Sequence, residues 1–450
     1  MSDKLFGTDG VRGIANSELI TANSALRLAQ AAVRVLVRET NCATVVIGRD
    51  TRASGEMLES AIAAGLASNG VNVLLAGVVP TPAVAYLTTK YCASFGVVIS
   101  ASHNPFQDNG IKFFGANGYK LSDESESAIE SEYFRPGPYQ PPTGKSIGRI
   151  RRMKQAVEDY AVFAASTVPK DFSLKGVKVA VDTANGAAYQ TTPMVLTMLG
   201  AAVELISGSP DGFNINADCG SIYPATLSRL VQESDAAFGI AHDGDADRLL
   251  FCDEHGIPLD GDELLAIAAL DLLTRNQLQK NTLVATVMSN FGLDETLHQH
   301  GGKVFRTEVG DRFVIDALVQ QHLNLGGEQS GHLVFRDFTT TGDGLIAALQ
   351  IIAVMSGTGK PLSELRRALN KFPQLLCNIT VGEKLPFEGF ALLMDRLREA
   401  ESALKGKGRV MLRYSGTEPK ARLLLEGPDA DELHQLAEAI VEELANNLGA

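Results

Sequence analysis

Three aspartates alternate with single residues in the segment DGDADR at 243–248. The segment lies between two apolar runs, AAFGIAH and LLFCD, which predict strands. In an extended segment, side chains two residues apart point the same way, so Asp243, Asp245 and Asp247 are expected to converge. Three bare carboxylates would repel one another, and a bound hard cation is the natural relief. We therefore favour a metal site over a solvated acidic turn.

Two other interpretations of this segment compete with the metal site. An EF-hand loop also begins D-x-D-x-D, and Glu254 falls at its twelfth position, but Arg248 stands at the sixth, where the loop needs glycine. Strands instead of helices flank the segment, so we reject the EF-hand. A phosphatase with an aspartyl nucleophile at a strand end is the better rival, with Asp243 as that nucleophile.

The segment VVISASHNPFQDNGIKFF at 97–114 passes from an apolar strand directly into polar residues. Ser102 would lie at the carboxyl end of a parallel strand, where α/β sheets place their ligands. His103 and Asn104 can hydrogen-bond to an anion, and an apolar setting could lower the pKa of Lys112 toward the role of a base. An Asn-Pro surface turn with an ordinary serine explains the segment equally well.

The segment GGEQSGH at 326–332 combines permissive glycines with a carboxylate, an amide, a hydroxyl and an imidazole. Such a loop suits a polyol, because one carboxylate can accept hydrogen bonds from two neighbouring sugar hydroxyls. A satisfied turn without a ligand remains the alternative.

The segment RYSGTEPKAR at 413–422 places hydroxyls around a glycine, with basic residues nearby. Backbone N–H groups of a glycine turn, together with hydroxyls and an arginine, form an anion nest. The segment therefore predicts a phosphate site.

The hydrophobic pattern along the chain alternates between the strand period and the helix period, and the elements it predicts must position these segments. Apolar runs typical of strands alternate with helical stripes, which predicts βαβ units and mainly parallel sheets. The first set has helices at 22–39, 54–70 and 83–91 and strands at 43–50, 71–77 and 94–100. The second set comprises strands at 176–182, 201–207 and 236–241 and a helix near 190–199, and the third comprises strands at 281–289 and 303–309 and a helix near 293–300. Ser54 is a candidate N-cap of the 54–70 helix and Gly70 its stop.

The chain from residue 370 onward differs, with amphipathic helices and alternating strands that predict a smaller α+β domain. The fold class expected is α/β: three related α/β domains with mixed, mainly parallel sheets and a C-terminal α+β domain around a central cleft. We expect four domains: 1–152 with the ASHNP segment, 153–256 with the aspartate segment, 257–369 with the GGEQSGH segment and 370–450 with the predicted phosphate site.

The charge balance of 40 Lys and Arg against 53 Asp and Glu argues against nucleic acid or an anionic membrane as a partner. The five cysteines are too few and too scattered for a disulfide framework, and none forms a C-x-x-C pair. The amino terminus has no apolar segment typical of a signal peptide, and no run of 18 apolar residues occurs. We expect a cytoplasmic protein.

Taken in order, four motifs resemble those of the α-D-phosphohexomutase family. ASHNP resembles its phosphoserine loop, DGDADR its magnesium loop, GEQSGH its sugar loop, and SGTEP with Arg422 its phosphate loop. The resemblance covers essentially the whole chain. It implies one Mg²⁺ per subunit, held by the three aspartates and phosphorylated Ser102. The residues it implies are Ser102, His103, Lys112, Arg12, Arg248 and His332 for catalysis, Glu328, Ser330, Thr307 and Gly310 for the sugar, and Ser415, Gly416, Thr417 and Arg422 for phosphate.

Within that family, FGTDGVRG at 6–13, VGDRFV at 309–314 and Gln329 resemble the members that act on glucosamine phosphates. Phe313, where tyrosine is expected, departs from that subgroup, and the YSGTEPKA segment looks more like the loop of the phosphomannomutase/phosphoglucomutase members, which remain the alternative.

The resemblance implies that glucosamine 6-phosphate and glucosamine 1-phosphate interconvert through a phosphoserine enzyme and glucosamine 1,6-bisphosphate. This reaction would supply UDP-N-acetylglucosamine and cell-wall synthesis. The fourth domain is expected to close over the cleft and exclude water, because water would hydrolyse the phosphoserine. The expected partner is a small hexosamine phosphate, and a homodimer is considered as the assembly.

Overall fold

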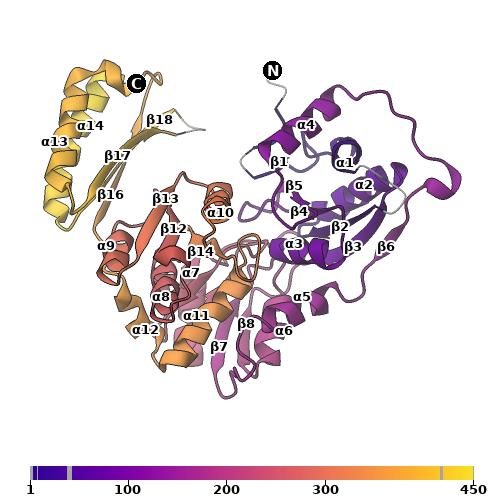
Figure 1. Ribbon diagram of the computed structural model, residues 1–450, viewed down its shortest axis with the longest axis horizontal. Coiled ribbons are helices and arrows are strands. Elements are labelled where there is room, and N and C mark those ends of the chain that lie inside the picture. The colour runs from indigo at the N-terminus through magenta and orange to yellow at the C-terminus, as the bar shows by residue number, and fades with distance from the viewer. Residues whose placement is uncertain (1–3, 8, 38–42, 416–418, 449–450) are drawn as a thin grey trace. The chain divides into compact units, whose positions relative to one another are not determined.

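The computed structural model describes residues 4–7, 9–37, 43–415 and 419–448. They form two compact units. Unit 1 comprises Met1–Val287 and Phe305–Ala368, and unit 2 comprises Met288–Val304 and Leu369–Ala450. Each unit is described separately below, with the elements labelled in Figure 1.

The first sheet of unit 1 has six strands in the order β1-β5-β4-β2-β3-β6. The strands are β1 (Val11–Ile14), β2 (Thr44–Arg49), β3 (Asn72–Val78), β4 (Phe95–Ile99), β5 (Asp108–Gly115) and β6 (Ile150–Arg152). Strands β2, β3, β4 and β6 are parallel, whereas β5 runs antiparallel to both β4 and β1. The accompanying helices are α1 (Ala22–Leu36), α2 (Ser54–Ser68), α3 (Thr81–Lys90) and α4 (Asp123–Phe134).

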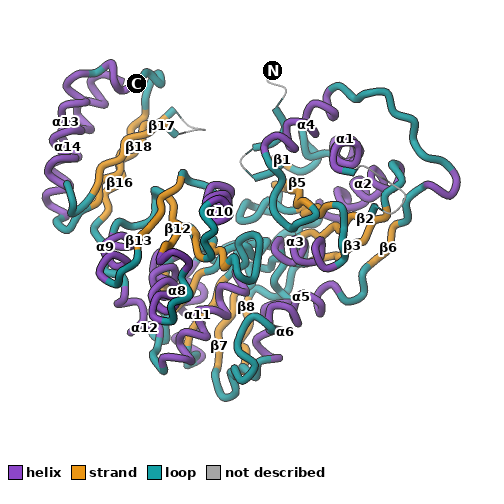
Figure 2. Tube along the Cα trace, viewed as in Figure 1, coloured by secondary structure: helices purple, strands orange, loops and turns teal. Residues whose placement is uncertain are grey.

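Both faces of this sheet are covered, which explains the unbroken apolar run of β2. Val45 and Ile47 join the core formed with α1 and α2. Because side chains alternate along a strand, Gly48 faces the other side, where a Cβ would meet Val84 of α3 at 2.4 Å. Because β2 pairs with β4 in parallel, their carboxyl ends lie side by side, and the loops that follow them start from one edge of the sheet (Figure 2).

The second sheet of unit 1 has five strands in the order β11-β10-β9-β7-β8. The strands are β7 (Lys178–Asp182), β8 (Ala202–Ile206), β9 (Phe238–Ala241), β10 (Leu250–Cys252) and β11 (Pro258–Leu259), and the helices are α5 (Ala156–Ala165), α6 (Thr191–Met198) and α7 (Pro224–Ser234). Strands β7, β8 and β9 are parallel, and β10 returns antiparallel to β9. The loop between β9 and β10 therefore reverses the chain direction within a few residues.

The third sheet has four strands in the order β13-β12-β14-β15. The strands are β12 (Thr282–Thr286), β13 (Lys303–Thr307), β14 (Leu325–Gly327) and β15 (Leu333–Phe335), and the helices of this part are α8 (Gly261–Thr274), α10 (Asp311–Gln320), α11 (Gly344–Thr358) and α12 (Leu362–Leu365). Strand β14 is parallel to β12 and antiparallel to β15. Asp260 caps α8 in a reciprocal capping box with Glu263, as the sequence DGDE permits.

Unit 2 contains an antiparallel sheet in the order β16-β18-β17, packed against two helices. Its elements are α9 (Gly292–Gln299), β16 (Gln374–Thr380), α13 (Ala391–Leu404), β17 (Arg409–Tyr414), β18 (Lys420–Glu426) and α14 (Ala430–Leu448). Short 3₁₀ turns occur in the chain at Gly144–Ser146, Gln279–Asn281, Arg366–Ala368 and Phe387–Gly389.

The predicted fold class is confirmed: three mixed α/β sheets with helices, and a smaller C-terminal α+β sheet. The predicted N-cap of α2 is wrong. Ser54 is the first helical residue, the cap position is Ala53, and the Ser54 hydroxyl instead accepts a hydrogen bond from Asn109 Nδ2 at 2.8 Å. Gly70 does end the helix, with a left-handed φ of 85°.

Among the described residues, no single helix has the length and apolar composition needed to span a membrane. One pair, Gly344–Thr358 with Leu362–Ala368, bent by 92° at its break, passes that test together by length and composition alone.

A buried hydrogen-bonded pair joins α5 to the start of α11. The Tyr160 hydroxyl lies 2.9 Å from each carboxylate oxygen of Asp343, and Asp343 Oδ1 accepts the Ile346 N–H at 2.9 Å as the N-cap of α11. Burial raises the pKa of Asp343 to about 6, although the bonds from Ile346 and Tyr160 oppose the change.

Asp343→Asn is expected to remove a pH-dependent part of the stability. The folded chain binds the Asp343 proton more tightly than the unfolded chain does. This contribution is therefore complete below about pH 3.8 and is lost as the pH rises through about 6. The difference in pKa corresponds to about 3 kcal/mol at most. Urea unfolding of both proteins from pH 4.5 to 7.5 measures it, and parallel pH profiles would contradict the prediction.

Candidate active site

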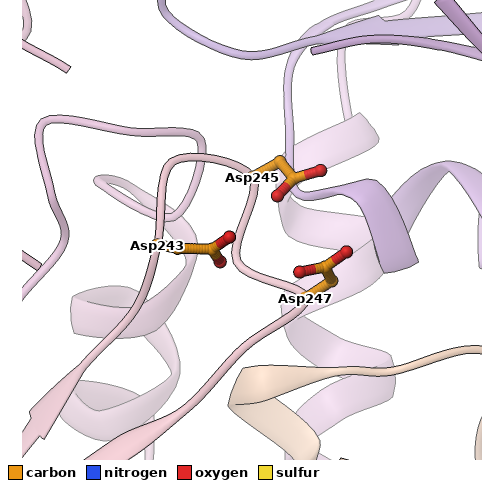
Figure 3. A group of neighbouring side chains, drawn as sticks. All are labelled: Asp243, Asp245 and Asp247. Atoms are coloured by element: carbon orange, nitrogen blue, oxygen red, sulfur yellow. The ribbon is translucent and has the colours of Figure 1, made fainter. Parts of the chain in front are cut away.

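The three aspartates of DGDADR converge, as predicted, in the loop between β9 and β10. A carboxylate oxygen from each of Asp243, Asp245 and Asp247 lies within 4.8 Å of the others, and all three side chains are buried. Figure 3 shows the carboxylates turned toward a common point. The reason given from the sequence is wrong, because the segment is a turn, not a strand, and Ala246 is left-handed with φ 59°. The tight reversal, and not period-two alternation, brings the carboxylates together.

The hydrogen bonds of this cluster leave two buried oxygens available. Asp243 Oδ2 accepts the Ser102 hydroxyl at 2.6 Å, and Asp245 Oδ2 accepts the Thr81 hydroxyl at 2.7 Å. In the described part of the chain, Asp245 Oδ1 and Asp247 Oδ1 are buried without a hydrogen-bond partner. Unpartnered buried carboxylate oxygens are costly, and they are the ligands that hard divalent cations prefer. The three residues present therefore fit a metal ion.

The charges within the cluster support the same conclusion. Burial, and then repulsion from Asp245, raises the pKa of Asp243 to about 6. Burial, with Asp245 and Asp243, raises the pKa of Asp247 to about 7. Burial also acts to raise the pKa of Asp245, but Lys112 outweighs it and lowers that pKa below its ordinary value. Lys112 and Arg248 both act on the cluster, yet the pKa values of Asp243 and Asp247 stay raised, so a bound cation would relieve the remaining repulsion.

Ser102 lies just beyond β4, in the segment 101–105, which we call the serine loop. It lies against the segment 243–248 between β9 and β10, which we call the metal loop. Its side chain is 2% exposed, and its hydroxyl reaches Asp243 across a separation of 141 residues. The His103 Nδ1 atom lies 3.3 Å from the same hydroxyl. Ser102 has a left-handed φ of 51°, a conformation that costs a non-glycine residue about 1 kcal/mol or more. The surface-turn alternative for this segment is excluded, since the serine is buried in a polar cluster.

Gly244 allows the metal loop to approach the serine loop. A Cβ at this position would lie 2.6 Å from the Ser102 carbonyl oxygen and 2.8 Å from Asn216 Nδ2. Gly244→Ala is expected to destabilise the protein by about 1–3 kcal/mol, as overpacking does, and to reduce turnover by separating the two loops. Gly357→Ala is the matched control, because no heavy atom lies within 4 Å of the added Cβ. Urea unfolding and turnover assays check the prediction, and equal behaviour of the two variants would contradict it.

Lys112 does not lie in the apolar setting expected from its strand. Its ammonium is buried 3.0 Å from Asp245 Oδ2, 2.9 Å from Asp9 Oδ2 and 4.0 Å from Asp247 Oδ2. Burial acts to lower the pKa of Lys112, but these carboxylates outweigh it and raise that pKa well above its ordinary value. The predicted lowering of the pKa of Lys112 is therefore wrong.

A network of ion pairs that the sequence did not reveal surrounds Arg12 and Lys112. Arg12 pairs with Asp9 and donates to the Ala101 carbonyl at 3.4 Å. Lys120 Nζ lies 2.6 Å from Asp9 Oδ1 and also pairs with Asp311. Asp9 lies inside the segment FGTDGVRG, which only the family resemblance singled out. Lys120 carries no local signal, because its partners come from distant segments.

His103 and Arg248 are two further polar residues near Ser102. Burial, followed by the nearby charge of Arg248 and of Arg12, lowers the pKa of His103 to about 4. Burial acts to lower the pKa of Arg248, but Asp243, Asp247 and Glu328 outweigh it and raise that pKa. A neutral imidazole and a guanidinium thus lie in the same charged cluster as the Ser102 hydroxyl.

The sugar-loop candidates of the third sheet lie in the turn between β14 and β15. Glu328 Oε1 accepts the Gly310 N–H at 3.1 Å, and Gln329 Nε2 lies 3.4 Å from Asp260 Oδ2. Gly331, with φ 90°, packs against Leu249, where a Cβ would lie 2.1 Å from the carbonyl oxygen. Leu249 follows directly on the metal loop, so the two loops are adjacent.

Three other candidates of the third sheet differ in their surroundings. The Ser330 side chain is exposed, and the Thr307 hydroxyl donates to the Glu308 carbonyl at 3.0 Å. His332 is buried, with Nε2 3.6 Å from Asp311 Oδ2, and in the described residues neither ring nitrogen has a hydrogen-bond partner. His332 is thus a buried imidazole with two available nitrogens.

The phosphate-loop candidates belong to unit 2. Ser415 follows β17, is buried, and donates its N–H to the Lys420 carbonyl at 2.8 Å. Arg422 lies on β18, in register with Asn378 on one side and Arg413 on the other. Gly416 and Thr417 lie outside the described residues.

A buried serine hydroxyl bonded to a carboxylate cluster that suits a metal, at the carboxyl edge of an α/β sheet, is typical of phosphoryl-transfer enzymes. Family models agree with this class over nearly the whole chain. Those for phosphoglucomutase/phosphomannomutase α/β/α domains I, II and III match residues 3–140, 158–256 and 260–372, and that for the C-terminal domain matches 376–443.

Proteins named phosphoglucosamine mutase are similar along their full length. The relative from Geobacter sp. strain M21 is 48% identical over 99% of this chain and 98% of its own, and that from Pelobacter propionicus is 49% identical over 99% of both. A phosphoglucomutase/phosphomannomutase family protein from Burkholderia thailandensis has the same fold, with a TM-score of 0.81 at 23% identity over 99% of this chain and 98% of that one. The chain belongs to the phosphoglucomutase/phosphomannomutase family and is a phosphohexomutase, an enzyme of the isomerase class.

Proposed function

We propose that the chain interconverts glucosamine 6-phosphate and glucosamine 1-phosphate through phosphorylated Ser102 and a glucosamine 1,6-bisphosphate. The observation that carries the phosphoserine route is the 2.6 Å contact between the Ser102 hydroxyl and Asp243 in a buried carboxylate cluster. The amino-sugar substrate is supported by the relatives named phosphoglucosamine mutase, at 48% and 49% identity. The product would feed synthesis of UDP-N-acetylglucosamine and the cell wall.

In the forward direction, Ser102 would give its phosphoryl group to the 1-hydroxyl of glucosamine 6-phosphate. The bisphosphate would then turn over and return its 6-phosphoryl group to the Ser102 oxygen, leaving glucosamine 1-phosphate. Both transfers need in-line positioning and neutralisation of phosphoryl oxygens. Arg12, His103 and Arg248 would steady the transferring group, since they share the polar cluster around the serine.

The carboxylates of Asp243, Asp245 and Asp247 would hold one Mg²⁺ ion per chain, together with an oxygen of phosphorylated Ser102. When bound, the ion would supply positive charge to the phosphoryl oxygens. A structure described as that of N-acetylphosphoglucosamine mutase from Aspergillus fumigatus in complex with GlcNAc-6P and magnesium has a similar fold, with a TM-score of 0.65 at 17% identity over 99% of this chain and 96% of that one. Magnesium is therefore the ion we expect.

His332 is the group to which we assign proton exchange with the sugar hydroxyl. Its two ring nitrogens have no hydrogen-bond partner among the described residues, whereas the Lys112 ammonium already contacts carboxylates. A neutral imidazole can accept the hydroxyl proton as the oxygen attacks phosphorus. Lys112 would then serve mainly to balance the charge of Asp245 and Asp9.

Two further loops would bind the substrate in either of its two orientations. Glu328 and Ser330, with Thr307 and Gly310, are proposed to bind the sugar hydroxyls, because a carboxylate can accept from two of them. Ser415, Gly416, Thr417 and Arg422 are proposed to hold the phosphate that is not reacting. Such a site would accept the bisphosphate either way round.

A coupled assay tests the substrate. Glucosamine 6-phosphate is compared with glucose and mannose phosphates at equal concentrations, on protein shown by intact mass to carry one phosphoryl group. The glucosamine phosphate is expected to give the highest kcat/KM. A higher value for glucose or mannose phosphate would favour the second candidate, a phosphoglucomutase or phosphomannomutase.

We place the reaction in the cytoplasm, where the thiols of Cys92, Cys219, Cys252 and Cys377 stay free.

A further inference from the structure

Two side chains, one from the segment between β2 and α2 and one from the loop between β8 and α7, hold the same pair of carbonyl groups in the serine loop. Arg52 Nη2 donates to the carbonyls of Ser102 at 3.1 Å and of Asn104 at 2.5 Å. Asn216 Nδ2 donates to the same two carbonyls, at 2.9 Å and 3.1 Å. The carbonyl oxygens on both sides of His103 are therefore turned toward two donors, one from each side of the interface between the first and second sheets.

Both side chains are buried and are themselves held in place. Arg52 is 0% exposed and pairs with Asp50, which accepts the Arg52 N–H at 2.9 Å. Asp50 Oδ2 accepts the Ser100 hydroxyl at 2.5 Å, and the same Ser100 oxygen accepts the Ser102 N–H at 2.9 Å. The Asn216 N–H donates to the Ala184 carbonyl at 2.9 Å in the second sheet's domain. The amide and the carbonyl of Ser102 are thus both anchored.

These anchors hold Ser102 in a conformation that it would otherwise leave. Its left-handed φ of 51° is unfavourable for serine, and such conformations persist only where the surroundings hold them. Phosphoryl transfer tolerates little displacement of the nucleophilic oxygen, because attack must be in line with the leaving group. We propose that Arg52 and Asn216 are positioning residues that hold phosphorylated Ser102 in line with the sugar hydroxyl and out of line with water. This inference rests on the proposed phosphoserine route.

Loss of either anchor should favour hydrolysis over transfer. In that side reaction a water oxygen attacks the phosphorus of phosphorylated Ser102, and the bond from phosphorus to the Ser102 oxygen breaks. The Ser102 oxygen takes up a proton, and inorganic phosphate leaves. In the described structure, Arg52 and Asn216 hydrogen-bond to the Ser102 carbonyl and not to its hydroxyl, so their effect would pass through the backbone of Ser102.

The test compares Arg52→Lys and Asn216→Ala with the unaltered protein. Lysine keeps the positive charge but cannot bridge Asp50 and two carbonyls with a planar group. Each variant is phosphorylated with glucosamine 1,6-bisphosphate, and inorganic phosphate released per mutase turnover is measured at saturating glucosamine 6-phosphate. We expect this ratio to rise about tenfold, kcat to fall roughly 10- to 100-fold, and KM to stay within about threefold because the sugar loop is unchanged.

The ratio of hydrolysis to transfer separates positioning from a loss of folded protein. A purely structural defect lowers both rates together and leaves the ratio unchanged, which would overturn the inference. Asn216→Ala removes two neutral donors without disturbing the Arg52–Asp50 pair, so it decides the question if Arg52→Lys folds poorly. Arg34→Lys is the matched control, since Arg34 pairs with Glu132 between α1 and α4. If the unaltered protein carries no phosphoserine and shows no turnover, the proposed function fails instead.

Discussion

Ser102→Ala is expected to abolish the covalent phosphate and to lower turnover by more than ~100-fold. The hydroxyl is the group that would carry the phosphoryl between the two ends of the sugar, and alanine removes it without adding volume. Ser102 Oγ bonds only to Asp243 and His103 in the described structure, so the fold should tolerate the change. Intact mass and peptide mapping measure the phosphate, and a coupled assay measures turnover.

The same experiment separates the mutase from an aspartyl-nucleophile phosphatase. In that rival, Asp243→Asn would abolish the covalent phosphate and Ser102→Ala would leave activity largely intact. Ser60→Ala is the matched control, because the Ser60 hydroxyl is exposed on α2 and donates to the Glu56 carbonyl. A covalent phosphate retained by Ser102→Ala would contradict the proposed route.

Removing the divalent ion, or one of its ligands, is expected to have the second large effect. Chelation should lower turnover by more than ~100-fold, and added Mg²⁺ should restore it. Asp247→Asn should raise the Mg²⁺ concentration needed for half-maximal activity, because Asp247 Oδ1 is one of the buried oxygens without a hydrogen-bond partner. Asp395→Asn is the matched control, with a carboxylate that is 61% exposed on α13.

The metal affinity should also depend on pH in a defined direction. Without an ion, the pKa values of Asp243 and Asp247 are raised to about 6 and about 7. Binding requires both carboxylates to be ionised, so apparent affinity is expected to fall as the pH drops below about 7. Calorimetric titration of Mg²⁺ at pH 8 and pH 6 measures this. Equal affinity at both values would contradict the assignment of these ligands.

Most elements could be predicted because their signals are local. The stripe of α1 and the apolar run of β2 arise from residues a few positions apart, and the structure has both elements within a few residues of the predicted limits. The predicted N-cap at Ser54 is wrong, and its hydroxyl is instead engaged by Asn109, which lies 55 residues away. Local rules cannot include a partner supplied by another strand.

The candidate site shows the same division. Asp243, Asp245 and Asp247 were found from their spacing, yet their convergence depends on a turn that the alternating pattern does not reveal. No local pattern singles out Arg52, although the charged segment after β2 begins at the same sheet edge as Ser102. The residues that flank Lys112 predict an apolar setting, but the groups that face its ammonium come from other segments.

The alternation of strands and helices, the residue types of the four loops and their resemblance to one enzyme family are evident from the amino-acid sequence alone. These properties depend on neighbours along the chain, where periodicity and turn chemistry act. The folded chain is needed to see that the Ser102 hydroxyl contacts Asp243, that Lys112 is surrounded by carboxylates and that Arg52 and Asn216 hold the serine loop. Contacts between residues 50 or more positions apart depend on how the chain packs, and burial then sets the charges and pKa values of the groups enclosed.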